Sequence, residues 1–302
     1  MLAVLFRKVH LSELLPEWTP RTIALLASGL VVTLLGIVLS AFRWRAVLDA
    51  LGLRAGVRRL LNHYLAGLFV GNFLPSTIGG DVLRVARQSA DNGDRPATFA
   101  SVVLERLTGW LVLPLITLSA FLINPSLRKL GNATALAFGL SVVTLVLLVA
   151  LLVAAAHPRV GGRLATSEGW QRFLGAVHLG VDRFRRHPTA VVNVLVAGFA
   201  YQLAVVLSAF CAARALDISV GPTAILAFMP AVAIAQVLPI SLGGLGVREG
   251  AFVLFLHPLG VERGDAIALG LLFYGMNLVV SLLGAPSFAV GAKPTASSNA
   301  IA

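Results

Sequence analysis

Long apolar runs separated by short polar segments dominate the chain. Five of them reach the ~20 residues that cross about 30 Å of hydrocarbon as a helix. They cover residues 23–42, 98–123, 133–155, 189–213 and 265–290. Lipid offers the backbone no hydrogen-bond partners, so such spans must be helical. The pattern predicts an all-α polytopic integral membrane bundle with about six full spans and two broken or re-entrant helices.

Two shorter apolar runs, residues 60–75 and 224–242, end in the same helix-breaking pattern. Residues 74–84 read Leu-Pro-Ser-Thr-Ile-Gly-Gly-Asp-Val-Leu-Arg, and residues 238–248 read Leu-Pro-Ile-Ser-Leu-Gly-Gly-Leu-Gly-Val-Arg. Proline interrupts a helix and glycine adopts backbone conformations that other residues avoid. The breakers shared by the two copies are Pro75, Gly79 and Gly80 in the first, and Pro239, Gly243 and Gly244 in the second. We expect two helices that turn back within the membrane, although residues 224–242 are also long enough to cross it.

Composition and charge place the chain in a membrane and orient it. It is 58% hydrophobic and 12% charged, with a mean hydropathy of +0.89, which excludes a soluble globular protein. The net charge of +11 would suggest a nucleic-acid partner in a soluble chain. Here the arginines gather in residues 43–59 and 157–187, as in cytoplasmic loops, so we expect no nucleic-acid partner. Trp44 is expected to anchor the first of these loops at the interface.

This orientation predicts one transmembrane domain over residues 1–302 with two halves of inverted topology. The halves cover about residues 22–156 and 188–291, joined by a basic cytoplasmic loop at 157–187 and followed by a disordered cytoplasmic tail at 292–302. Secondary transporters use inverted halves whose broken helices meet near the membrane midplane. We therefore expect a multi-pass protein of the inner or plasma membrane.

Charged residues inside apolar sequence are the candidate site. A charge at the bilayer centre costs at least ~2.5 kcal/mol, so it indicates a function. The six such residues are Asp81, Arg84, Glu105, Arg106, Arg248 and Glu249. Structural alternatives are that the two breaker arginines extend to the interface and that Glu105 and Arg106 pair with each other.

We favour lipid-headgroup binding by these residues. Arg84 and Arg248, with the N–H groups around the two glycine pairs, would bind phosphate. The three carboxylates would bind a cationic group or position the arginines. The two arginine-bearing tips are expected to face each other across a polar cavity.

Enzyme motifs are missing from the sequence. Gly243 to Gly246 lacks the lysine of a phosphate-binding loop, and there is no His-Glu-x-x-His, cysteine pair or Gly-x-Ser-x-Gly. We therefore expect no metal, no cofactor and no catalytic residue.

Several of these residues together resemble a known family. They are Arg43-Trp44, Asn72-Phe73-Leu74-Pro75, Gly79-Gly80-Asp81-x-x-Arg84, Glu105-Arg106 and Leu238-Pro239-x-Ser241-x-Gly243-Gly244-x-Gly246-x-Arg248-Glu249. From about residue 38 to residue 290 the chain resembles the lysylphosphatidylglycerol synthase transmembrane, or flippase-like, family. This is the membrane part of multiple peptide resistance factors, which moves aminoacylated lipid between leaflets. The family's soluble aminoacyl-transfer domain and its additional first helix have no counterpart in these residues, so the resemblance does not imply synthesis.

The resemblance implies binding and translocation of an anionic phospholipid, an aminoacylated lipid or a lipid-linked precursor. The alternative is a membrane-embedded transferase, or its non-catalytic subunit, with Asp81 or Glu105 as the base. A third reading is an anchor for a soluble enzyme partner. The expected partners are thus a membrane lipid and either a soluble enzyme or a second copy of the chain.

Overall fold

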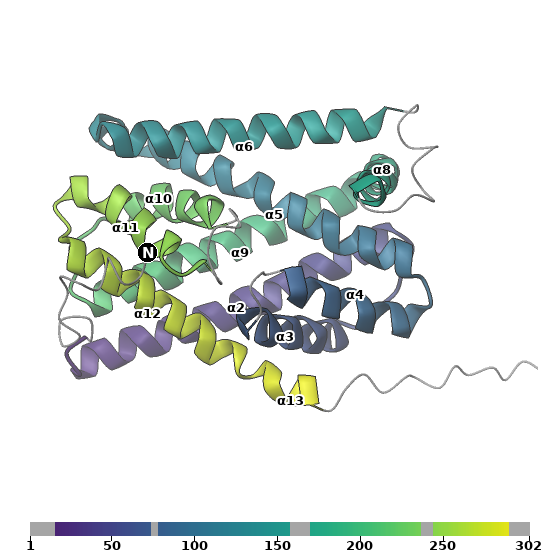
Figure 1. The fold of residues 1–302 in the computed structure, drawn as a ribbon, viewed down its shortest axis with the longest axis horizontal. Coiled ribbons are helices and arrows are strands. Elements are labelled where there is room, and N and C mark those ends of the chain that lie inside the picture. The colour runs from purple at the N-terminus through teal and green to yellow at the C-terminus, as the bar shows by residue number, and fades with distance from the viewer. Residues whose placement is uncertain (1–15, 74–77, 158–169, 237–243, 290–302) are drawn as a thin grey trace, which may run out of the picture.

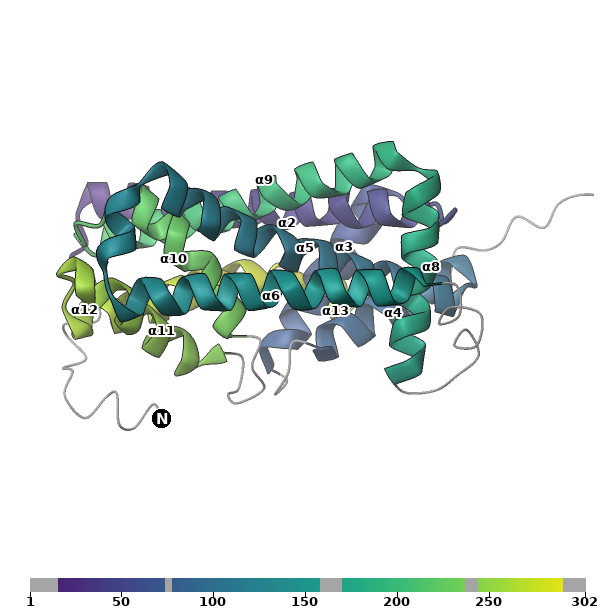
Figure 2. The same ribbon diagram turned by 90° about the horizontal axis from the view of Figure 1, so that it is seen from above.

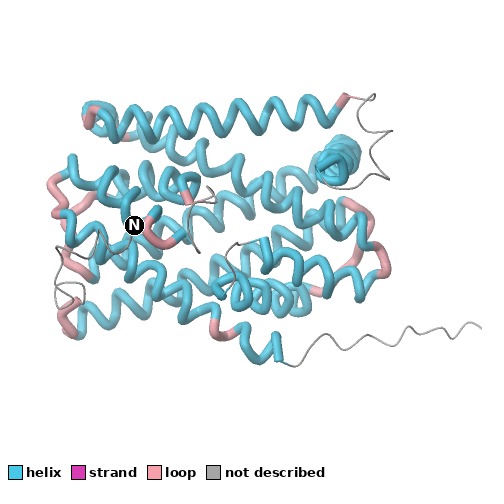
Figure 3. Tube along the Cα trace, viewed as in Figure 1, coloured by secondary structure: helices cyan, strands magenta, loops and turns pink. Residues whose placement is uncertain are grey.

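The protein is a bundle of helices that run side by side (Figure 1). The computed structural model describes residues 16–73, 78–157, 170–236 and 244–289. No strand occurs in these ranges (Figure 3). The helices are α2 (Pro20–Ala50), α3 (Val57–Phe73), α4 (Ile78–Asn92), α5 (Arg95–Ile123), η3 (Pro125–Lys129), α6 (Asn132–Ala156), α8 (Trp170–Arg186), α9 (Pro188–Ala215), α10 (Pro222–Ala235), α11 (Val247–Leu256), η5 (His257–Leu259), α12 (Arg263–Ser281) and α13 (Gly284–Ala289).

The expected helical membrane protein is confirmed. Five helices of the described ranges, namely α2, α5, α6, α9 and α12, are long and apolar enough to cross a membrane, against about six expected. The last span is shorter than expected: α12 ends at Ser281, and the separate helix α13 follows.

Helix α2 extends well beyond its expected end, which corrects the reading of Arg43 and Trp44. The helix has 31 residues, about 46 Å at a rise of 1.5 Å per residue. Arg43 is only 4% exposed and Trp44 is fully buried, so neither is an interfacial anchor. The reason is that α5 supplies a polar partner for each: Ser101 Oγ accepts from Trp44 Nε1 at 2.9 Å, and Glu105 accepts from Arg43.

Each breaker stretch connects two helices, and we call each of these two pairs of helices a hairpin. Helices α3 and α4 lie toward one end of the bundle, and α10 and α11 lie toward the other (Figures 1 and 2). Residues 74–77 and 237–243, which include Pro75, Pro239 and Gly243, lie outside the described ranges. Helix α10 has only 14 residues, about 21 Å, and so is shorter than a full crossing. Helix α4 also takes up most of the polar segment at residues 85–97.

The first helices of the two halves, α2 and α9, pack antiparallel. At one end Arg21 pairs with Asp217 at 3.6 Å, and further along Thr33 Oγ1 hydrogen-bonds Ser208 Oγ at 2.8 Å. Beyond that contact, Gly36 lies against the ring of Tyr201. Along this series of contacts the residue numbers increase on α2 and decrease on α9, so the two helices run in opposite directions. Opposite directions of the first helices are what inverted halves require.

The segment at residues 157–187, expected as a basic loop, contains helix α8. This helix lies across the ends of the long helices (Figure 2). Its apolar side buries Ala176 and Val177, while Arg183, Arg185 and Arg186 occupy its last turn. Cations there interact favourably with the negative end of the helix dipole. Such segregation of apolar and basic residues suits a helix at the membrane surface.

Helices α3 and α4 touch backbone to backbone at two glycines. A Cβ at Gly80 would collide with the carbonyl of Gly67, and a Cβ at Gly67 would lie 2.9 Å from both the Gly80 oxygen and Cγ of Arg84. Gly67 and Gly80 therefore permit the close approach of the two helices. Because the contact is with backbone, no side-chain adjustment can relieve an added methyl group.

We predict that Gly80→Ala lowers stability by about 2 kcal/mol, the usual cost of overpacking. Thermal unfolding in detergent would measure it. Gly139→Ala on α6 is the matched control, because its Cβ would meet no atom within 4 Å and alanine favours a helix. Equal stability of Gly80→Ala and wild type would contradict the hairpin packing.

Candidate functional site

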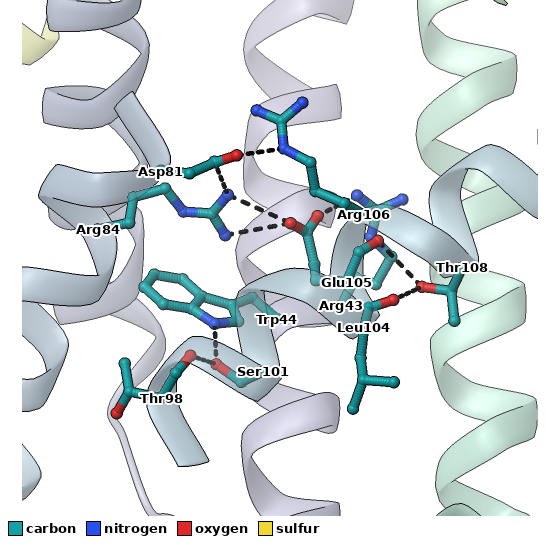
Figure 4. Close-up of polar contacts among 10 residues, drawn as sticks. All are labelled: Arg43, Trp44, Asp81, Arg84, Thr98, Ser101, Leu104, Glu105, Arg106 and Thr108. Carbon is teal, nitrogen blue, oxygen red and sulfur yellow. Dashed lines mark hydrogen bonds and ion pairs between the residues drawn. The ribbon is translucent and has the colours of Figure 1, made fainter. Parts of the chain in front are cut away.

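Five charged side chains from three helices form one network inside the bundle (Figure 4). Arg43 comes from α2, Asp81 and Arg84 from α4, and Glu105 and Arg106 from α5. Asp81 and Arg84 are three residues apart on α4 and so share a face of that helix. Glu105 and Arg106 are adjacent and point in different directions, toward different partners.

Glu105 is the central carboxylate of the network. Its Oε2 accepts from Nη1 and Nη2 of Arg84, both at 3.2 Å, and its Oε1 accepts from Arg43. Asp81 accepts from Arg84 at 3.2 Å and also pairs with Nε of Arg106. The residues thus alternate in charge in the order Arg43, Glu105, Arg84, Asp81, Arg106. Glu105 and Arg106 bind separate partners rather than each other.

Aromatic rings hold the two buried guanidinium groups. The Arg84 guanidinium carbon lies 4.2 Å from the ring centroids of both Trp44 and Tyr64, so two rings flank it. The Arg43 guanidinium lies 5.3 Å from the ring centroid of Tyr201. The negative faces of the rings stabilise these cations where water is scarce.

The network is not electrically balanced. Three arginines and two carboxylates sum to +1. Glu105 is 1% exposed, whereas the side chain of Arg106 is 38% exposed. Among the described residues nothing accepts a hydrogen bond from Nε and Nη1 of Arg43 or from Nε of Arg84, although these atoms are buried. Buried charge without a counter-ion is costly, so an anion would stabilise this site.

The second breaker stretch leads into a separate, neutral pair. Arg248 and the fully buried Glu249 pair at 3.1 Å, and Arg248 lies over the ring of Tyr274 at 4.7 Å. The N–H of Gly246 donates to the other Glu249 oxygen at 2.5 Å. The φ angles of Gly244 and Gly246 are +81° and +86°, which favour glycine.

A cavity of about 130 Å³ lies between the halves. Its polar lining comes from four helices: Thr33 of α2, Tyr64 and Asn72 of α3, Tyr201 and Ser208 of α9, and Asn277 and Ser281 of α12. Neither Arg84 nor Arg248 is among the described residues that line it. This cavity therefore does not place the two arginines face to face as expected, and residues 74–77 and 237–243 of the two tips lie outside the described ranges. Tyr64 and Tyr201 instead connect the first network to the cavity wall.

The structure thus groups Asp81, Arg84, Glu105 and Arg106, and places Arg248 and Glu249 elsewhere. Gly79 lies in the first turn of α4, while Gly80 packs against α3. Sequence reasoning did not assign Arg43, Trp44, Tyr64 or Tyr201 to the site. The available signal was Arg43-Trp44 at the end of a span, which also fits a basic loop. Nothing in the sequence relates Tyr201 to Arg43, because α9 meets α2 only in the folded bundle.

Comparison with known proteins identifies most of the chain. The family model described as "Lysylphosphatidylglycerol synthase TM region" matches residues 1–284. No curated protein matches the chain.

We predict that Glu105→Gln destabilises the protein by about 3 to 5 kcal/mol, because it leaves two buried guanidinium groups without their shared counter-ion. Thermal unfolding in detergent is the measurement. The double variant Arg43→Gln/Glu105→Gln restores the net charge of +1 and should recover part of the loss.

The control is Arg45→Gln. Arg45 pairs with Asp49 at 3.6 Å, but both side chains are about half exposed, so we expect a change below about 1 kcal/mol. A Glu105→Gln variant no less stable than Arg45→Gln would show that the buried network does not support the fold.

Proposed function

Because the chain belongs to the lysylphosphatidylglycerol synthase transmembrane family, we propose that it binds an anionic lipid headgroup at the Arg43–Glu105–Arg84–Asp81–Arg106 network and moves that lipid between leaflets. The family and the five apolar helices make it a multi-pass membrane protein related to lipid modification or flipping. The finer statement, translocation of an anionic lipid, is the proposal. We expect α8 on the cytoplasmic side of the inner or plasma membrane.

The formal charge of +1 that the five network residues carry together is the observation that supports this function. Two carboxylates hold three arginines in place, but they leave one charge for a ligand. Arg106, the most exposed of the three arginines, is the first that an incoming phosphate would meet. Guanidinium groups match phosphate oxygens geometrically, and attraction in a site of low dielectric is strong.

The same geometry argues against the transferase alternative. A general base needs an oxygen within reach of a substrate proton. Both oxygens of Glu105 accept from arginines and the side chain is buried, while both oxygens of Asp81 pair with arginines. In this arrangement the carboxylates position cations, and neither oxygen pair is available for proton abstraction.

The packing of the halves supports a transport role. The antiparallel α2 and α9 meet through small groups, including Gly29 beside Cys211 and Gly36 beside Ala204. Small residues allow helices to approach closely in membranes. The pair α3 and α4 and the pair α10 and α11 lie toward opposite ends of the interface between α2 and α9 (Figure 1). Rocking of one half against the other along α2 and α9 would expose the network to each leaflet in turn.

The test is leaflet exchange in proteoliposomes. Vesicles that contain fluorescent phosphatidylglycerol report exchange through quenching of the outer leaflet by dithionite. We expect the wild type to accelerate exchange. Arg84→Gln should lower the exchange rate at least about tenfold, because it removes a charged group that hydrogen-bonds the phosphate. Arg84→Lys should lose most of it as well, since an ammonium lacks the planar fork that stacks between Trp44 and Tyr64.

Arg21→Gln is the matched control. Arg21 is a well-exposed arginine that pairs with Asp217, and we expect full activity after its replacement. Wild-type protein that fails to accelerate exchange of phosphatidylglycerol and of every other anionic lipid from its native membrane would rule out translocation. Product formation from a lipid acceptor and a donor would establish the transferase instead.

A further inference from the structure

The cavity between the halves has a mixed apolar and polar lining without charged groups in the described ranges. No carboxylate, ammonium or guanidinium is present among the described residues that line it. The polar groups are hydroxyls and amides. The neighbouring arginine network, by contrast, is charged. A headgroup that reached both sites would contact charged guanidinium groups at one and neutral hydroxyls and amides at the other.

Several polar groups of the cavity lack a partner. The amide nitrogen of Asn277 donates to the Phe273 carbonyl at 2.7 Å, and that of Asn72 donates to Ser281 Oγ at 2.7 Å. In the described ranges, nothing hydrogen-bonds to the oxygen of either amide or to the hydroxyls of Tyr64 and Tyr201. The cavity thus offers two acceptors and two hydroxyls, which act as donor or acceptor.

The two tyrosines join this cavity to the arginine network. The ring of Tyr64 covers one face of Arg84, and the ring of Tyr201 lies against Arg43. Both side chains also line the cavity. A group attached to a phosphate at Arg43 or Arg84 would therefore lie beside the two tyrosines that line the cavity.

We propose that this cavity binds the uncharged, hydroxyl-bearing part of the lipid headgroup, such as glycerol or a sugar, while the arginine network binds its phosphate. This assignment rests on the proposed function and adds the class of headgroup to it. Vicinal hydroxyls donate and accept hydrogen bonds, which matches the mixture of amide oxygens and phenol hydroxyls. A headgroup without hydroxyls would leave these buried polar groups unpaired and would therefore bind more weakly. This difference would make the cavity selective for headgroups that carry hydroxyls.

A cationic headgroup fits the same cavity poorly. An ammonium in a site of low dielectric is costly without a carboxylate to neutralise it. The carboxylates of the neighbouring network, Asp81 and Glu105, already pair with arginines, and the network's net charge of +1 repels a further cation. The cavity therefore favours neutral polar headgroups over aminoacylated ones.

The experiment compares two lipids of equal charge. Phosphatidylglycerol carries two hydroxyls beyond its phosphate, whereas phosphatidylmethanol carries the same phosphodiester and no hydroxyl. Their affinities for the full chain in detergent are measured by displacement of a fluorescent anionic lipid. We expect the wild type to bind phosphatidylglycerol about tenfold more tightly, as one or two net hydrogen bonds would produce.

Two variants locate that preference. Tyr201→Phe keeps the ring over Arg43 and removes only the hydroxyl, and Asn277→Leu removes an amide of similar size. Each should reduce the preference to less than about threefold and leave the affinity for phosphatidylmethanol unchanged, which also shows that the variant is folded. Ser28→Ala, at an exposed position on α2 that bonds only Ala24, is the control and should keep the full preference.

The other outcomes separate this inference from the proposed function. Equal wild-type affinity for the two lipids would overturn the headgroup assignment and leave anionic-lipid binding intact. Tighter binding of lysylphosphatidylglycerol than of phosphatidylglycerol would also overturn it. Failure of both anionic lipids to bind would refute the proposed function, and the headgroup assignment with it.

Discussion

The buried carboxylate of Glu105 is the interaction on which the arrangement of the first half depends. It joins Arg43 of α2 and Arg84 of α4 to α5, so three helices converge on one side chain. Removing Glu105 takes away the carboxylate that pairs with the buried Arg43, at a cost of several kcal/mol. The network is therefore a constraint on helix packing as well as a candidate binding site.

The hairpin of α3 and α4 brings Arg84 to that carboxylate. Close approach of the helices at Gly67 and Gly80 lets Arg84 cross the hairpin, and Gly67 leaves room for its Cγ. Tyr64 on α3 and Trp44 on α2 then enclose the guanidinium. Ser101 in turn holds the indole through a 2.9 Å hydrogen bond. Backbone contact, aromatic stacking and ion pairing thus restrict the same arginine to one position.

The two breaker copies have different electrostatic surroundings despite their similar sequences. Arg84 belongs to a network of five charges with a net charge of +1, while Arg248 pairs with its neighbour Glu249 in a neutral unit. In the second copy Leu245 stands where the first has Asp81. The charged part of the proposed binding site is therefore concentrated in the first half, and the second half contributes α9 and α12 to the cavity wall.

The sequence by itself determined the class of the protein. Apolar runs of membrane-spanning length can only be helices in lipid, and breakers within them predict hairpins. Intramembrane charges are rare enough that Asp81, Arg84, Glu105 and Arg106 could be singled out without a structure. The helical membrane class could be inferred in this way because it depends on local composition and spacing, which are visible along one chain.

Only the tertiary structure decided which charges meet. The sequence left open whether Glu105 pairs with Arg106 or positions the breaker arginines, and it predicted that the tips bearing Arg84 and Arg248 face each other across a cavity. The structure pairs Glu105 with Arg43 and Arg84, and it pairs Arg248 with Glu249. Arg43 looked like part of a basic loop because the end of α2 depends on partners from α5 that are about 60 positions away. Pairing across helices follows from how their faces pack, and a linear pattern contains no information about which faces come together.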